Sequence, residues 1–209
     1  MSRIRIIKTS ILVFLIISLA FAIKDPLFPH LTFLMHFVTV IGFLLMVADI
    51  WKNYVSLVAY TAFSLFLLLH IIGACWVYSF VPYNDWLVNT IGFDLDGYFG
   101  FQRNQFDRLV HFSFGLLYFP VFYELCERKL QRKIFSLLFA FLLVQFFSVL
   151  YELFEWYLTL VLGEKDVEGY NGQQGDMWDA QKDMGLAMLG AAVTWIIYVI
   201  ASQLKPKPR

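Results

Sequence analysis

Charged side chains are scarce in this sequence. Aspartate, glutamate, lysine and arginine make up 15% of its 209 residues, whereas soluble domains carry about 25%. The acidic and basic residues balance to a formal net charge of zero, which argues against the strongly basic surface of a nucleic-acid-binding protein. Hydrophobic residues account for 60% of the chain and the mean hydropathy is +0.67. This composition predicts an integral membrane protein.

Cysteine and familiar catalytic motifs are also scarce. The two cysteines, Cys75 and Cys126, are placed at opposite membrane faces by the topology below, beyond the Cα separation of about 7 Å that a disulfide allows. The sequence contains no Cys-x-x-Cys motif, which argues against a zinc–thiolate or redox centre. It also contains no His-Glu-x-x-His motif, internal repeat or low-complexity tract.

Long apolar runs are what the sequence has instead. Each run approaches or exceeds the ~20 residues that cross the ~30 Å hydrocarbon core of a bilayer. The predicted spans are residues 9–23, 31–50, 54–80, 107–125, 134–163 and 183–204. The fold class is therefore all-α, a polytopic bundle of six transmembrane helices, and residues 1–209 form a single membrane domain because the linkers are too short to hold a second fold. A signal peptide cleaved after Ala22 is the alternative interpretation of the first run.

Lysine and arginine assign the two sides of the membrane. They are concentrated near the N-terminus (residues 3–8), in the turns 51–53 and 127–133, and in the tail 205–209. Six spans place these four segments on one side, which the positive-inside rule makes cytoplasmic. Both termini are therefore predicted to be cytoplasmic. The two long polar loops, 81–106 and 164–182, are then predicted to face the periplasm.

Two pairs of ionisable residues lie near the predicted outer ends of the spans. Glu152 and Glu155 are three residues apart, and Asp107 and His111 are four residues apart. Either spacing places both members of a pair on one face of a helix. A charged side chain at the centre of a membrane helix costs about 2.5–3.5 kcal/mol, so residues of this kind tend to face a protein interior and to mark function.

A third group of acidic residues leads into the last span. Asp176, Asp179 and Asp183 are spaced i, i+3 and i+7, which makes one stripe if this segment is helical. The topology brings them to the same level as the two pairs. We expect the residues 164–183 to cover a polar site there.

Carboxylates and imidazole are ligands for hard or borderline divalent metals, and a water on such a metal becomes a nucleophile near neutral pH. Clustered carboxylates also exchange protons with a substrate. The candidate catalytic residues are Glu152, Glu155, Asp107 and His111. The candidate ligands of a divalent metal cofactor are Glu152, Glu155, His111, Asp179 and Asp183.

Simpler roles compete with these assignments. Asp107 is also a suitable N-cap for its span, or a partner of Arg103 or Arg108. Glu155 fits the headgroup region, and the aspartate stripe fits a solvated loop face. Other polar and small residues favour structural roles. His36 and His70 fit histidines that are hydrogen-bonded between helices, while Gly185 and Gly190, with the alanines near them, predict a close helix-packing face.

Three segments carry a resemblance to a known family: residues 104–112 (NQFDRLVHF), 151–156 (YELFEW) and 174–184 (QGDMWDAQKDM). Together they resemble the YjdF-like bacterial inner-membrane proteins, over the full length and closely enough to suggest the member after which the family is known. The resemblance implies a multi-pass protein of the bacterial inner membrane. It implies no particular reaction.

A looser resemblance is to VanZ-like membrane proteins, a group linked to glycopeptide resistance. It rests on Asp107-Arg108-x-x-His111-Phe112, on Glu152-x-x-Glu155, and on Asp179 or Asp183 ahead of a helix rich in small residues. Arginine stands here where that pattern has lysine, and glutamate where it has glutamine.

Three functions fit this sequence. The first is a membrane enzyme acting on a lipid or envelope precursor at the outer leaflet. The second is a transporter or ion-binding protein, although ionisable residues are nearly absent from the inner half of the predicted spans. The third is a structural or stress-related membrane component whose polar layer holds the helices together. The expected partners are the lipid bilayer and, for an enzyme, its lipid substrate, with no nucleic acid.

Overall fold

The computed structural model describes residues 2–161 and 174–204, and the regular structure within them is entirely helical. The helices are α1 (Arg3–Ala22), α2 (Pro29–Lys52), α3 (Leu57–Cys75), α4 (Tyr83–Ile91), α5 (Leu95–Phe99), α6 (Phe106–Leu130), α7 (Lys133–Val161) and α9 (Asp179–Leu204). Six of them, namely α1, α2, α3, α6, α7 and α9, are long and apolar enough to cross a membrane. The predicted all-α, polytopic fold is confirmed.

The helix over the third apolar run is shorter than that run. It ends at Cys75, and the backbone then takes a left-handed conformation at Val77 and Tyr78. Tyr78 turns back so that its backbone N–H donates to Gly73 O (2.7 Å). Its ring packs where a Cβ on Gly73 would come within 2.6 Å. This turn directs Tyr78 into the bundle, toward the end of α3.

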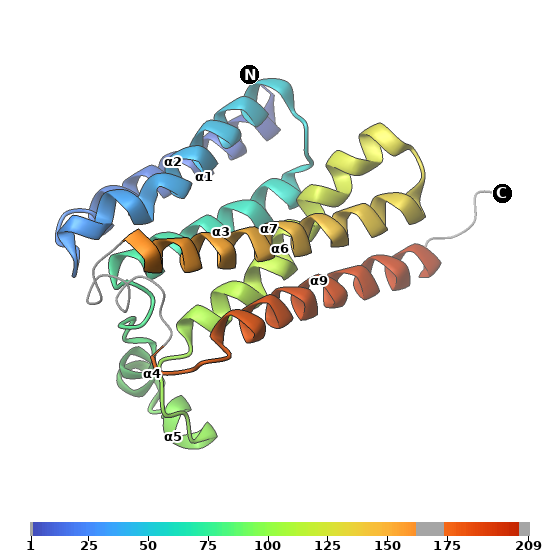
Figure 1. The fold of residues 1–209 in the computed structure, drawn as a ribbon. Helices are drawn as coiled ribbons and strands as arrows, with labels where there is room; N and C mark the ends of the chain where they lie inside the picture. Colours follow the sequence, from blue (N-terminus) through green and yellow to red (C-terminus); the bar gives the residue numbers. More distant parts are fainter. Residues whose placement is uncertain (1, 162–173, 205–209) are drawn as a thin grey trace.

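The turns rich in lysine and arginine meet at one end of the bundle (Figure 1). There Arg5 Nε donates to Ile50 O (3.2 Å) and Arg128 Nη2 donates to Asn53 O (2.8 Å). The residues 76–105 and 174–178 lie at the opposite end. Residues 162–173, from the loop expected to cover the site, and the tail 205–209 are outside the described residues.

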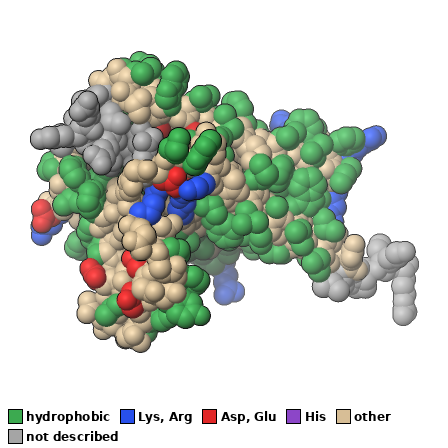
Figure 2. All heavy atoms as spheres, turned by 60° about the horizontal axis from the view of Figure 1, so that its bottom comes forward, with side chains coloured by type: hydrophobic (Ala, Val, Ile, Leu, Met, Phe, Trp, Pro, Cys, Tyr) green, Lys and Arg blue, Asp and Glu red, His purple; other side chains and the backbone are tan. Residues whose placement is uncertain are grey.

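Charge is distributed unequally between the two ends. On the face in Figure 2, hydrophobic side chains cover the flank of the bundle, and acidic and basic side chains lie together at the loop end. Basic side chains without acidic neighbours stand at the other end of this face. Such a flank fits a bilayer.

Helix α6 lies at the centre, between α3, α7 and α9. Its crossing with α9 is very close: a Cβ at Gly115 would strike Ala187 O, and one at Gly190 would strike Phe112 O. Thr194 Oγ1 donates to Leu116 O across the same contact (2.9 Å). The predicted small-residue packing face of the last span is therefore confirmed at Ala187, Ala191 and Gly190.

The prediction was wrong for Gly185. This residue is exposed, and a Cβ there would meet nothing within 4 Å. It precedes Gly190 by five residues, which rotates it roughly 140° around the helix at 3.6 residues per turn. Gly185 therefore faces away from α6.

A buried ion pair joins the first three helices at the end that carries the basic turns. Lys8 on α1 is 1% exposed, and its Nζ lies 2.6 Å from Asp49 Oδ2 on α2. It also donates to Asn53 Oδ1 (2.9 Å) and Val55 O (2.7 Å). The Tyr60 hydroxyl on α3 donates to Lys8 O (3.1 Å). Every Lys8 ammonium proton thus has an acceptor, which is the condition for burying a charge.

Candidate functional site

The first turn of α6 carries the first two candidate residues. The helix begins at Phe106 after Gln105 as its N-cap, so Asp107 is not the cap and its buried carboxylate points to other partners. His111 lies one turn deeper and is also buried. Its Nε2 is 3.6 Å from Asp107 Oδ1.

Helix α7 brings a second carboxylate to the other side of the same ring. Glu152 is buried, and its Oε1 lies 3.6 Å from His111 Nδ1 without accepting a hydrogen bond from the described residues. Each nitrogen of His111 therefore faces a carboxylate, at a distance longer than a hydrogen bond. Glu155, one turn further along α7, is half-buried and interacts with Tyr151 and Glu152.

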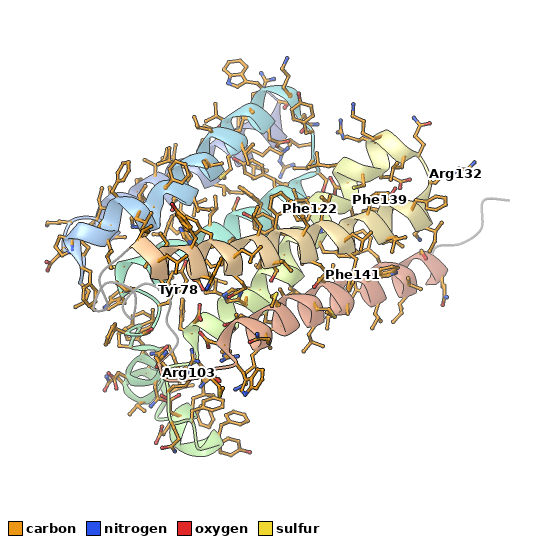
Figure 3. All side chains as sticks on the ribbon, in the orientation of Figure 1. Tyr78, Arg103, Phe122, Arg132, Phe139 and Phe141 are labelled. Atoms are coloured by element: carbon orange, nitrogen blue, oxygen red, sulfur yellow. The ribbon has the colours of Figure 1, made fainter. Side chains whose placement is uncertain are left out.

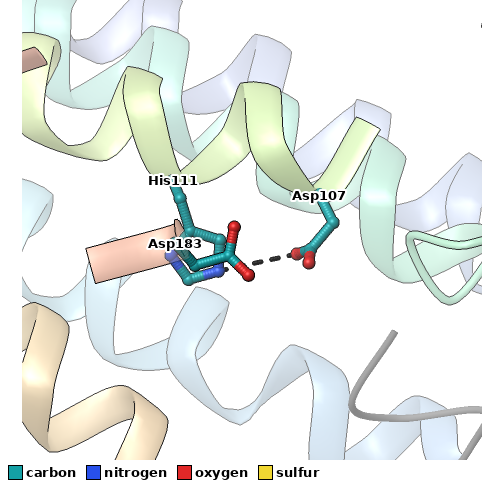
Figure 4. Close-up of side chains that lie close together, drawn as sticks. All are labelled: Asp107, His111 and Asp183. Atoms are coloured by element: carbon teal, nitrogen blue, oxygen red, sulfur yellow. Dashed lines mark ion pairs between the residues drawn. The ribbon is translucent and has the colours of Figure 1, made fainter. Parts of the chain in front are cut away.

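Helix α9 completes the cluster with Asp183, which is 2% exposed. Asp107, His111 and Asp183 each offer one ligand atom, and these atoms all lie within 4.8 Å of one another (Figure 4). Asp183 Oδ1 accepts no hydrogen bond from the described residues. Two carboxylates and an imidazole, supplied by two helices and bordered by Glu152 from a third, form a donor set suited to a divalent cation.

The remaining aspartates of the stripe are held by arginines. Arg108 Nη2 donates to Asp179 Oδ1 (2.6 Å) and to Asp176 Oδ2 (2.9 Å), and its Nε lies 3.7 Å from Asp183 Oδ1. Arg103, which Figure 3 labels at the loop end of the bundle, contacts Asp179 with its Nη1. Asp179 and Asp183 share one face of α9, whereas Asp176 precedes the helix, so the predicted helical stripe holds for two of the three aspartates. This ionic network fixes the start of α9 against α6.

Asp176 lies outside the membrane-spanning helices, in the turn before α9. A hydrogen bond from Lys182 Nζ (2.5 Å) and one from the backbone N–H of Trp178 (3.0 Å) stabilise its carboxylate. These bonds hold the pKa of Asp176 below its ordinary value. The turn is therefore fastened by a charged carboxylate at neutral pH.

The structure brings some of the sequence-predicted residues together and separates others. Asp107, His111, Glu152 and Asp183 meet in one buried cluster. Asp179 is nearby, but its carboxylate is engaged by Arg103 and Arg108. The two arginines, considered as partners of Asp107, pair with the aspartates of the last segment instead.

Two aromatic residues at the site were missed in the sequence. The Tyr78 hydroxyl donates to His70 Nδ1, and His70 Nε2 donates to Met35 O on α2 (3.0 Å). The role of His70 in joining helices is therefore confirmed, while His36 contacts Thr39 on its own helix (Nδ1 to Oγ1, 3.2 Å).

Tyr151 is the second aromatic residue, and it lies against His111 with 5.9 Å between ring centroids. Tyr151 was within reach of sequence reasoning, because it directly precedes Glu152.

An apolar cavity of about 310 Å³ adjoins this cluster, and its lining includes Asp107 and His111. Side chains of α2, α3, α6 and α7 form its walls. From the end that contains these two residues, the cavity extends along α6 past Phe114 and Tyr118 to Phe122. Asp107 and His111 therefore belong both to the polar cluster and to the lining of the apolar cavity.

Comparisons with known proteins agree with this architecture. The family model described as "Predicted membrane protein (DUF2238)" matches residues 6–203. The inner membrane protein YjdF of Escherichia coli (strain K12) is 34% identical over 140 residues, which cover 66% of this chain and 62% of that protein. The match thus spans less than two thirds of the relative's length. No solved structure matches the chain.

These findings support the predicted kinship at the level of the family. The resemblance also suggested that the chain is YjdF itself, whereas an identity of 34% supports a relative of YjdF. With six apolar helices and these matches, the chain is a multi-pass protein of the inner membrane.

Proposed function

The chain belongs to the DUF2238 family of predicted membrane proteins, and we propose that it is a membrane-embedded enzyme acting on a lipid or lipid-linked envelope precursor. The observation that carries this proposal is that Asp107 and His111 line both the polar cluster and the apolar cavity. Binding sites for small molecules combine an apolar enclosure with a few convergent polar groups. A substrate with a polar head and a hydrocarbon tail matches both parts.

The charge of the cluster supports a bound cation. Among the described residues, the carboxyl groups in and around the cluster are Asp107, Glu152, Glu155, Asp176, Asp179 and Asp183, and the basic side chains near them are Arg103, Arg108, Lys182 and His111. Carboxylates thus outnumber the basic groups, and uncompensated charge is costly in a buried site. A divalent cation on Asp107, His111 and Asp183 would supply the missing positive charge.

Such a cation would also supply the chemistry. It would polarise a substrate oxygen and turn a bound water into a nucleophile near neutral pH. Glu152, whose Oε1 accepts no hydrogen bond from the described residues, would serve as the general base and then the general acid of such a reaction. The reaction class that this arrangement serves is metal-assisted hydrolysis or transfer at a lipid headgroup. With the predicted orientation of the termini, the site opens toward the periplasm.

A transport function receives less support from the cavity. Past its polar end, its described lining carries polar atoms at Tyr118 and Ser148 and is otherwise apolar. An ion crossing the membrane needs polar groups along its route.

Metal analysis of the purified full chain tests the cation. We expect about one divalent ion per chain in the wild type and a loss of at least about tenfold in affinity in His111→Gln and Asp183→Asn, because each removes a ligand. Asp85→Asn, on the surface of α4, is the control. Equal metal content in all four proteins would contradict the metal site.

Lipid analysis tests catalysis. Membranes from cells that make the wild type should differ in one lipid class from membranes of cells that make Glu152→Gln at the same level. Identical lipid profiles with metal still bound would favour an ion-binding protein. A Glu152→Gln protein that merely unfolds more readily would favour the structural role.

A further inference from the structure

The apolar cavity is a groove between two helices that each pack elsewhere. Helix α2 packs on α1 and α3, and α7 packs on α6 and α9, so the space between α2 and α7 has α3 and α6 as its floor. The lining side chains lie within residues 38–45 of α2, 63–70 of α3, 107–122 of α6 and 147–151 of α7, with Tyr78 from the turn after α3.

Polarity changes along this groove. Tyr78 bonds to His70 and packs on Phe106, the residue before Asp107. His111 lies beside Asp107 and Tyr151, so the polar lining residues gather at one end. Phenylalanine and aliphatic side chains dominate the remainder. Figure 3 shows Tyr78 toward the loop end of the bundle and Phe122 much further from it. The groove therefore has one end for a polar head and a longer part for a hydrocarbon.

The length and width of the groove fit one chain. From His111 to Phe122 the α6 wall extends roughly 16 Å at 1.5 Å per residue, close to the ~15 Å of one leaflet of the hydrocarbon core. A cavity of about 310 Å³ spread over that length is much narrower than the roughly 10–12 Å of a helix. A hydrocarbon chain therefore fits the groove, and a helix does not.

The groove is accessible from the side of the bundle. Ile41 and Leu45 on α2, and Phe147 on α7, line it and are themselves exposed on the apolar flank. In a membrane protein this flank faces lipid. A lipid chain can therefore enter laterally, without passing through the headgroup region.

We propose that this groove binds one hydrocarbon chain of a membrane amphiphile whose polar head rests at Asp107 and His111. The inference rests on the proposed function for the role of the head, but the binding of the chain is a property of the groove alone. It narrows the substrate class to amphiphiles that can place one chain between α2 and α7.

Adjacent leucines on α2 provide a matched test. Leu45 lines the groove and Leu44 does not, and both are well exposed, at 57% and 65%. Leu45→Trp should fill the entrance, and Leu44→Trp should add the same ring to the outer flank. Neither side chain belongs to the buried core, so both variants should fold.

The probe is a phosphatidylethanolamine with a diazirine on one acyl chain, in vesicles of palmitoyl-oleoyl phosphatidylglycerol that contain the purified full chain. After illumination, mass spectrometry locates the label. We expect label on the α6 segment 114–122 in the wild type and in Leu44→Trp, and a decrease of about threefold or more in Leu45→Trp, because the added ring competes for the same space.

Label spread evenly over the flank, or an equal yield in Leu45→Trp and Leu44→Trp, would overturn the inference. So would the absence of label from the segment 114–122 in the wild type, which is the result expected if a second copy of the chain filled the groove. Metal content in the same preparations separates the two proposals. If Leu45→Trp loses the label but keeps the metal, the groove and the metal site are independent, and if the wild type is labelled but holds no metal, only the proposed function fails.

Discussion

His111 on α6 and Glu152 on α7 face each other in the interior of the bundle, with 3.6 Å between Nδ1 and Oε1. The opposite ring nitrogen, Nε2, faces Asp107 at the same distance. Asp183 lies beside this imidazole and its two carboxylates. A cation or a proton bound here would offset the negative charge of the carboxylates. The predictions below follow from this cluster and from the contacts that hold its helices in place.

Arg108 is predicted to hold the start of α9 in place. Arg108→Gln removes the bridge to Asp176 and Asp179, and hydrogen bonds to charged groups contribute about 1.5–3 kcal/mol each. Amides of residues 179–183 should therefore exchange with deuterium about tenfold faster or more. Lys182→Gln, which removes one bond to Asp176 from an exposed side chain, is the control. Equal exchange in the two variants would refute the bridging role.

The close crossing of α6 and α9 gives a second prediction. Gly190→Ala places a Cβ against Phe112 O, and overpacking of this kind costs about 1–3 kcal/mol. The melting temperature in detergent should fall. Gly185→Ala, on the same helix, meets no atom within 4 Å and should be neutral or stabilising by up to ~1 kcal/mol, since alanine favours helix. Similar effects of the two substitutions would argue against the crossing.

Lys8 is predicted to stabilise the three N-terminal helices. Lys8→Met leaves Asp49 buried without its partner, a loss of about 3–5 kcal/mol for a buried pair. Lys24→Met, at an exposed lysine, should have little effect on thermal unfolding. Adding Asp49→Asn to Lys8→Met should restore part of the loss because it removes the isolated charge. Equal melting temperatures for Lys8→Met and Lys24→Met would show that the pair of Lys8 and Asp49 does not stabilise the protein.

The contacts of Lys8 with α2 and α3 also predict that α1 is retained in the mature protein. Intact mass spectrometry can check this.

The Asp176 turn predicts a dependence on pH. Because the folded protein holds the pKa of Asp176 below its unfolded value, the stabilisation is complete above the unfolded pKa of about 3.9 and is lost as pH falls through the folded one. The difference in melting temperature between the wild type and Asp176→Asn should be constant above about pH 5 and should shrink below about pH 4. A difference that is unchanged at low pH, or that widens, would contradict this assignment.

The sequence predicted much of the fold because its signals are local. Runs of apolar residues specify membrane helices by length alone, and the basic turns do meet at one end of the bundle. The grouping of Asp107, His111 and Glu152 followed from depth and helical spacing.

The sequence could not predict which side chains pair between helices, because pairing depends on how each helix is rotated and tilted. The contact of Gly115 with Gly190 sets the α6–α9 crossing, and this crossing directs Arg108 to Asp179 rather than to Asp107. Asp49 lies three residues before Lys52 in the sequence, whereas its partner is Lys8, from a different helix. The groove depends on the spacing of α2 and α7, for which the sequence carries no local signal.

The central claim is that His111, with Asp107 and Asp183, binds a divalent cation. Electron spin-echo envelope modulation of the full chain loaded with Mn²⁺ tests it directly, because the method detects a nitrogen nucleus bound to the metal. We predict ¹⁴N coupling from one imidazole in the wild type and in His36→Gln, and its loss in His111→Gln. Mn²⁺ without ¹⁴N coupling in the wild type, or coupling that persists in His111→Gln, would contradict the account.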